Sequence, residues 1–272
     1  MQLRVQRVQF GIHRLQFFIQ HESQEVAMDA VASLTLHALS EGRGKPLMGY
    51  GRLLRTACAK SPPPYGEAWY GEKYRAVGRD PSWLAQSLIA NAQKEGDGAR
   101  KLWILASRAR DPKIAEKVRI HAIDESRHSA LYLRMLDITF PGAVGDDLRP
   151  LLKEIPPGYT VQQRPARLPE EPDDEVLDEL IQMNIGEIRT RIHQLLLRPV
   201  ITVHCERSDR ARLERILDSI LWDETKHIRY TAELIESAIA AGETTFVRST
   251  MRQRLEEFNE ITLKEVQGPD FE

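Results

Sequence analysis

The sequence DESRH at residues 124–128 recurs as DETKH at residues 223–227, and this repetition determines which fold we expect. In each stretch a glutamate stands three positions before a histidine, an arrangement that none of the other six histidines has. This spacing places both side chains on one helix face, one turn apart, where they can bind the same metal ion. A single Glu-x-x-His motif in 272 residues is close to chance, so the prediction depends on the second copy.

Both motifs fall within helical stripes that are otherwise mostly apolar. The first stripe comprises Ile114, Val118, His121, Glu125, His128, Tyr132 and Met135, and the second comprises Leu213, Leu217, Ile220, Glu224, His227 and Leu234. A carboxylate on a buried face is unfavourable without an opposite charge. A bound metal ion would supply that charge.

Helix-start signals predict a first helical hairpin. Aspartate–proline pairs at 80–81 and 111–112 each place a capping acid before a proline, which predicts helices over 81–108 and 112–138. The short gap between them favours an antiparallel pair. Seven prolines between residues 139 and 173 exclude a long helix and predict a long crossover.

A second hairpin follows the crossover. Helices are predicted over 174–204, with Pro199 as the point where this helix could kink, and over 209–241. Two hairpins joined by one long connection describe an all-α, ferritin-like four-helix bundle with one crossover and extra flanking helices.

We expect one structural domain in three parts. Residues 1–80 supply an N-terminal helix near 22–41 and an irregular, aromatic-rich cover over 46–80. Residues 81–242 form the bundle, and residues 243–272 form a C-terminal helix and tail. No stretch has the alternation that is typical of a strand.

The remaining two bundle helices each contribute one glutamate. Glu95 precedes the first turn by the same fifteen residues by which Glu125 follows it, so both lie at one height, about 22 Å along the helices. Glu187 and Glu224 straddle the second turn almost as evenly. The alternative for a lone mid-helix glutamate is a salt-bridged surface residue.

The predicted metal ligands are Glu95, Glu125, His128, Glu187, Glu224 and His227. Four carboxylates offset the charge of two divalent ions. Mixed oxygen and imidazole ligands suit two iron ions, or a manganese–iron pair, better than magnesium or a structural zinc site.

In the order Glu, Glu-x-x-His, Glu, Glu-x-x-His, residues 81–240 resemble the di-iron carboxylate proteins of the ferritin-like superfamily. The aspartate before each motif glutamate, with a basic residue before the histidine, is similar to the pattern of bacterial multicomponent hydroxylases and acyl-carrier-protein desaturases. The resemblance implies that Asp124 and Asp223 hydrogen-bond the metal-bound rings of His227 and His128, respectively. The alternative for both aspartates is an exposed position on a helix.

Three further residues are candidates for roles near the metals. Thr190, one turn after the third-helix glutamate, corresponds to a catalytic hydroxyl in desaturase-like sites, unless it bonds its own backbone. His121 is either a hydrogen-bonded core residue or a seventh ligand, as in enzymes similar to p-aminobenzoate N-oxygenase. Those enzymes carry the extra histidine on the last helix, where this chain has Ile220. Tyr132 is expected to be a pocket wall.

The resemblance implies an O₂-dependent, non-haem di-iron monooxygenase or oxidase that hydroxylates, desaturates or N-oxygenates a small organic substrate. Ferredoxin or a flavin reductase would supply the electrons. Two alternatives stay open: a ferritin-like ferroxidase or iron-handling protein without an organic substrate, and a bundle whose acids and histidines form only a buried polar network. The sequence does not define the substrate, the type of oxidation, the metal pair or the electron donor.

Composition sets limits on location and partners. Thirty-eight Lys and Arg against 40 Asp and Glu give a net charge of −2, which does not favour binding to nucleic acid or to an anionic membrane. Cys58 and Cys205 match no paired metal spacing, which favours a reducing, cytoplasmic setting. Arg4, Arg7 and Arg14 interrupt the apolar start, so we expect neither a signal peptide nor a spanning segment, with an organelle transit peptide as the alternative. A homodimer stays open.

Overall fold

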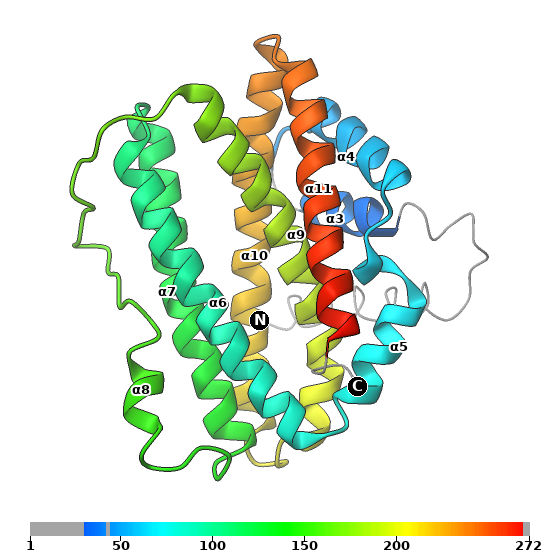
Figure 1. Ribbon diagram of the computed structural model, residues 1–272, viewed down its shortest axis with the longest axis vertical. Coiled ribbons are helices and arrows are strands. Elements are labelled where there is room, and N and C mark those ends of the chain that lie inside the picture. Colours follow the sequence, from blue (N-terminus) through cyan, green and yellow to red (C-terminus); the bar gives the residue numbers. More distant parts are fainter. Residues whose placement is uncertain (1–29, 42–43, 269–272) are drawn as a thin grey trace. The chain divides into compact units, whose positions relative to one another are not determined.

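The computed structural model describes residues 30–41 and 44–268 (Figure 1). These residues form helices and connections without a strand, which confirms the all-α prediction. The predicted helix near 22–41 is present as α3 (Ala30–Ser40), and its first eight residues lie outside the described ranges. No helix in those ranges combines the length and the apolar character needed to cross a membrane.

The chain clusters into two compact units. The α6–α7 unit comprises Gly78–Leu177 and Arg198–Asp223. The α4–α11 unit comprises the described residues up to Val77, Asp178–Leu197, and the described residues from Glu224 onward. Helices α9 (Asp173–His204) and α10 (Arg210–Ala240) contribute residues to both units.

Helices α6 (Pro81–Arg108) and α7 (Pro112–Thr139) form the predicted antiparallel hairpin and lie side by side in Figure 1. Each begins at a proline that follows a capping aspartate. Backbone N–H groups in the first turns donate to the side chains of Asp80 and Asp111, with N–O distances of 2.8 and 2.7 Å. The local cap signal therefore fixed both helix starts.

The crossover after α7 contains one short helix, α8 (Arg149–Lys153), and is otherwise irregular, as its prolines predict. It lies against the hairpin. The ring of Tyr159 stacks on Trp103 with centroids 4.1 Å apart, and the Ile155 carbonyl approaches Gly96 so closely that a Cβ there would lie only 2.7 Å from its oxygen. Glycine is therefore required on α6 where the crossover passes.

The expectation of an irregular cover over 46–80 is wrong. Most of this segment is helical, as α4 (Met48–Lys60), the 3₁₀ turn η1 (Pro64–Gly66) and α5 (Ala68–Val77). Its glycines and prolines suggested loops, but they fall within or between three short helices. Tertiary packing here outweighs the low intrinsic helix propensity of glycine.

Helix α4 begins without a local capping residue. Instead, the carboxylate of Glu236 on α10 accepts hydrogen bonds from the backbone N–H groups of Gly49 and Tyr50, at 3.0 and 2.6 Å. This acid lies 187 positions from Gly49. Because the cap comes from so far along the chain, no sequence window around α4 contains its start signal.

Helices α9 and α10 lie within one residue of their predicted limits, and α11 (Thr244–Gln267) is the predicted C-terminal helix. Helix α9 continues through Pro199. Helix α11 packs against α4, and the Arg254 guanidinium binds both carboxylate oxygens of Asp178 on α9, at 2.8 and 2.6 Å. This two-point ion pair fixes α11 to α9.

Candidate metal centre

Three side chains of the α6–α7 unit converge as the sequence predicts: Glu95 from α6, and Glu125 and His128 from α7. Each offers one ligand atom, and these three atoms lie within 4.8 Å of one another. Glu95, Glu125 and His128 are 9%, 5% and 0% exposed, respectively. We call these residues the first carboxylate–histidine set. The distances confirm that Glu95 lies at the height of the motif on α7.

The ring of His128 is oriented for metal binding. Its Nδ1 lies 3.3 Å from Oε1 of Glu125, whereas its Nε2 lies 3.6 Å from Oδ2 of Asp223. A metal-binding histidine characteristically has one nitrogen toward the ion and the other N–H directed at a carboxylate. Asp223 therefore faces the ring of His128, while the predicted hydrogen bond between them stays a prediction.

Arg127 is a residue of this site that sequence analysis did not identify. Its guanidinium forms an ion pair with Asp223 and contacts Asp124 at 3.4 Å. It therefore holds the carboxylate that in turn faces His128. The position directly before the motif histidine was visible as basic in both copies of the pattern, and this was the signal available. The predicted contact of Asp124 with His227 stays a prediction.

The charges of the first set are strongly coupled. Burial alone would raise the pKa of Glu125, but the hydrogen bond with Glu95 and the positive ring of His128 hold this pKa well below its ordinary value. Burial alone would lower the pKa of His128, yet the charge of Glu125 and the nearby carboxylate of Asp223 raise it to about 10. In the absence of a metal the set therefore carries a proton on His128, which a bound cation must replace.

His121 lies beside the same carboxylate. It is buried, and its Nε2 lies 3.3 Å from Oε1 of Glu125. This oxygen therefore faces two imidazoles, those of His121 and His128. The contact is compatible with both expectations for His121, a hydrogen-bonded core histidine and a seventh metal ligand. Tyr132, one turn beyond the motif, is also buried.

The α4–α11 unit contains the second carboxylate–histidine set, which comprises Glu187 from α9, and Glu224 and His227 from α10. Nδ1 of His227 lies 3.5 Å from Oε2 of Glu187 and 4.0 Å from Oε2 of Glu224. All three residues are buried. As in the first set, Nδ1 is the nitrogen that faces the carboxylates, and a glutamate from the neighbouring helix joins the motif.

A buried hydrogen-bond network fixes α9 against α10 next to the second set. The Asn184 amide donates to the Ile228 carbonyl and the Thr231 hydroxyl, at 3.1 and 2.8 Å. Its oxygen accepts from the Tyr50 hydroxyl of α4, at 2.9 Å. Asn184 lies one turn before Glu187. The sequence analysis did not identify this network, although a polar residue in an apolar stripe was a visible signal.

Two more residues of α9 lie near the second set. Burial lowers the pKa of Arg191 to about 10, against the opposing charges of Glu41 and Glu224, and its Nε donates to the Thr225 hydroxyl at 3.1 Å. The predicted catalytic Thr190 is half-buried, and its hydroxyl forms no hydrogen bond with another residue in the described ranges. The alternative, in which the Thr190 hydroxyl bonds the backbone of its own helix, is therefore not observed.

Comparisons of the chain with protein-family models, with curated proteins and with solved structures find no match. Any functional assignment therefore rests on the side chains described above.

Proposed function

We propose that the two carboxylate–histidine sets together bind two iron ions, or a manganese–iron pair, and that the protein is an O₂-dependent oxygenase or oxidase of a small organic substrate. The observation that carries the proposal is the convergence of Glu95, Glu125 and His128 on one buried point. The second set repeats this combination of ligand types, with its own Nδ1 facing two carboxylates.

The residues present fit such a centre. Carboxylate oxygens with imidazole nitrogens form a donor set that iron and manganese accept, and four glutamates balance two divalent charges. The raised pKa of His128 shows that the buried carboxylates of the first set already attract positive charge there. Magnesium would favour an all-oxygen set, and a structural zinc site would favour cysteines.

A ferritin-like four-helix bundle is the fold that we propose for this centre. Helices α6 and α7 pack as one hairpin. Helices α9 and α10 contact each other through Asn184 and Thr231, and through the ion pair of Arg198 with Asp218. A long crossover joins the two pairs of helices. This order of elements is typical of the ferritin-like arrangement.

The chain's own residues would have distinct tasks. Bound iron would supply the electron chemistry with O₂ that no side chain provides. The six ligands would hold the ions, Asp223 would orient the ring of His128, and the Thr190 hydroxyl would hold a proton at its Oγ1 near the substrate. An external protein such as a ferredoxin or a flavin reductase would return the electrons.

Metal counting and O₂ consumption test this proposal. We expect the purified protein, loaded anaerobically with Fe(II), to retain two ions per chain and to consume O₂ faster when its substrate is present. A protein that binds no metal would overturn the whole proposal. Continuous conversion of free Fe(II) into mineral, without any organic product, would instead establish the ferroxidase alternative.

Thr190→Val tests the catalytic assignment separately. We expect this variant to retain both ions and to lose about tenfold or more of its substrate-dependent turnover, because a positioned proton donor is absent. Thr202→Val is the matched control on the same helix, since the Thr202 hydroxyl donates to its own backbone, at the Arg198 carbonyl. Equal turnover in the two variants would remove Thr190 from the mechanism.

A further inference from the structure

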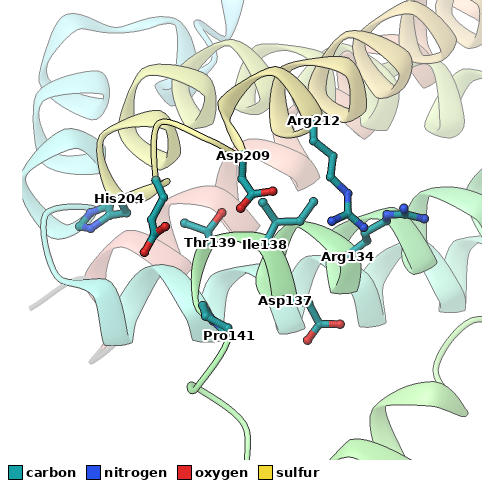
Figure 2. A pocket seen from close by; sticks show the side chains of 9 residues that line it. Arg134, Asp137, Ile138, Thr139, Pro141, His204, Asp209 and Arg212 are labelled. Carbon is teal, nitrogen blue, oxygen red and sulfur yellow. The ribbon is translucent and has the colours of Figure 1, made fainter.

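A cavity of about 710 Å³ lies in the α6–α7 unit, lined by the end of α7 and by the turn that leads into α10 (Figure 2). Its volume is within the range of about 300–1,000 Å³ that small-molecule sites have. Thr139 in its wall is eleven residues after His128, or about 16 Å along α7. The cavity is therefore separate from the first carboxylate–histidine set.

One end of the cavity is positive. Arg134 from α7 and Arg212 from α10 both line it, and Figure 2 shows both side chains reaching toward the same end. Neither arginine forms an ion pair with any residue in the described part of the chain. Both side chains are exposed, and two guanidinium groups that reach toward the same end favour the binding of an anion there. A carboxylate fits, since each guanidinium can donate two parallel hydrogen bonds to it.

The opposite end offers acceptors. Nε2 of His204 lies 2.9 Å from the Gly78 carbonyl, and because a carbonyl only accepts, Nε2 carries the hydrogen. In the neutral ring, Nδ1 is then an acceptor. The acids Glu206 and Asp209 also line the cavity. In Figure 2, His204 lies at the end away from the two arginines. This end suits a cationic group, such as an ammonium.

A buried hydroxyl lies between the two ends. Thr139 is only 8% exposed, and its Oγ1 has no hydrogen-bond partner among the described residues. A buried hydroxyl without a partner is unfavourable, so a ligand in the cavity would satisfy it. The remaining acid of the wall, Asp137, is already paired with Arg149 at 2.8 Å. The charges that are left in the cavity are two positive and two negative.

We propose that this cavity binds a small zwitterion of the amino-acid type. Its carboxylate lies between Arg134 and Arg212, and its ammonium group lies toward His204, where it meets the acids of the wall, Glu206 and Asp209. A simple anion would contact only the arginines, and a simple amine would contact only the acids. The zwitterion satisfies both ends and gives the Thr139 hydroxyl a partner.

Isothermal titration calorimetry on the full chain tests this site with four probes: free amino acids, the matching carboxylic acids without the amine, the matching amines without the carboxylate, and inorganic phosphate. We expect at least one amino acid to bind with a stoichiometry of one. We expect its two truncated analogues and phosphate to bind about tenfold more weakly or worse, because each leaves one charged end unsatisfied.

Arg212→Gln and Arg134→Gln should each weaken binding of that amino acid by about tenfold or more. Arg215→Gln is the matched control, because Arg215 is an exposed residue of α10 outside the cavity, and it should bind like the unmodified protein. Thr139→Val, which keeps the side-chain shape, should weaken binding less than either arginine variant. Circular dichroism would verify that each variant is folded.

Three results would overturn the proposal. The first is that no amino acid binds at about 10 mM. The second is that the carboxylic acid without its amine, or phosphate, binds as tightly as the amino acid, and the third is that both arginine variants bind the amino acid with unchanged affinity. The titration does not depend on bound metal or on O₂. Its failure would therefore leave the proposed metal centre intact.

Discussion

The two carboxylate–histidine sets use the same ligand types in the same order, but different contacts hold them. In both sets the histidine Nδ1 faces a carboxylate, at 3.3 Å for Glu125 and 3.5 Å for Glu187. Charged groups support the first set, where Asp223 faces His128 and is itself paired with Arg127. Next to the second set, Asn184 and Thr231 form neutral hydrogen bonds between α9 and α10, and the Arg191 guanidinium adds a positive charge near Glu224.

This difference shows that one motif can be positioned in two physical ways. An ion pair orients a ring through charge, so the first set should respond to changes of charge and of pH. An amide network orients a helix through packing and hydrogen bonds, so the second set should respond mainly to changes in stability. The following experiments, from the largest expected effect to the smallest, test whether the two sets serve one centre and whether this distinction holds.

Removal of one glutamate from either set should have the largest effect. If both sets bind one pair of ions, Glu125→Ala and Glu224→Ala should each lose both ions, because each buried site would lack a ligand and a compensating charge. Two independent sites would instead leave one ion in each variant. The measurement is the ratio of iron to protein after anaerobic loading and desalting.

Glu214→Ala is the control for this comparison, since Glu214 is exposed on α10. It should retain both ions. Full retention of both ions in Glu125→Ala would show that the ligand assignment is wrong.

Asp223→Asn should lower the metal affinity about 10- to 100-fold, because the contact that orients His128 loses its charge. Competition with a chelator measures this change. Thr231→Val removes a hydrogen bond next to the second set without removing a charge, and we expect a smaller loss of affinity. If Thr231→Val weakens binding as much as Asp223→Asn does, the contrast between charged and neutral support is not valid.

Metal affinity should rise with pH. The pKa of His128 is about 10 in the metal-free protein, so at neutral pH a metal ion must displace a proton from the ring. Raising the pH removes that proton before binding. Affinity should therefore increase about tenfold per pH unit from this residue alone, and should level off above about pH 10. Titration with Co(II) at pH 7 and pH 8 measures the effect, and equal affinities at the two values would contradict it.

Tyr50→Phe should have the smallest effect. The variant removes the hydroxyl that donates to Asn184, and we expect the free energy of unfolding in urea to fall by about 1 kcal/mol. Tyr159→Phe is the control, because the Tyr159 ring stacks on Trp103 and its hydroxyl has no hydrogen bond in the described ranges. Equal stability of the two variants would mean that the network contributes nothing measurable beside the second set.

Helix limits were predictable where the signals are local. The aspartate–proline pairs before α6 and α7 act within two residues of the helix start, and both predictions are confirmed. Helix α4 was missed because its cap, Glu236, belongs to α10. The glycine and proline content of residues 46–80 predicted an irregular segment, which is wrong, since packing against distant helices makes most of it helical.

The sequence by itself determined the two motifs, their positions on helix faces and the membership of each carboxylate–histidine set. Helical spacing and the distance from a turn fix these properties, and both are counted in residues along the chain. Only the tertiary structure decided which nitrogen of His128 faces Glu125, that Arg127 holds Asp223, and that two arginines and two acids line one cavity. The pair of Arg127 with Asp223 and the lining of the cavity join side chains that are distant in sequence, and the ring of His128 lies between its neighbour Glu125 and the distant Asp223. Local spacing does not encode the directions in which such side chains meet.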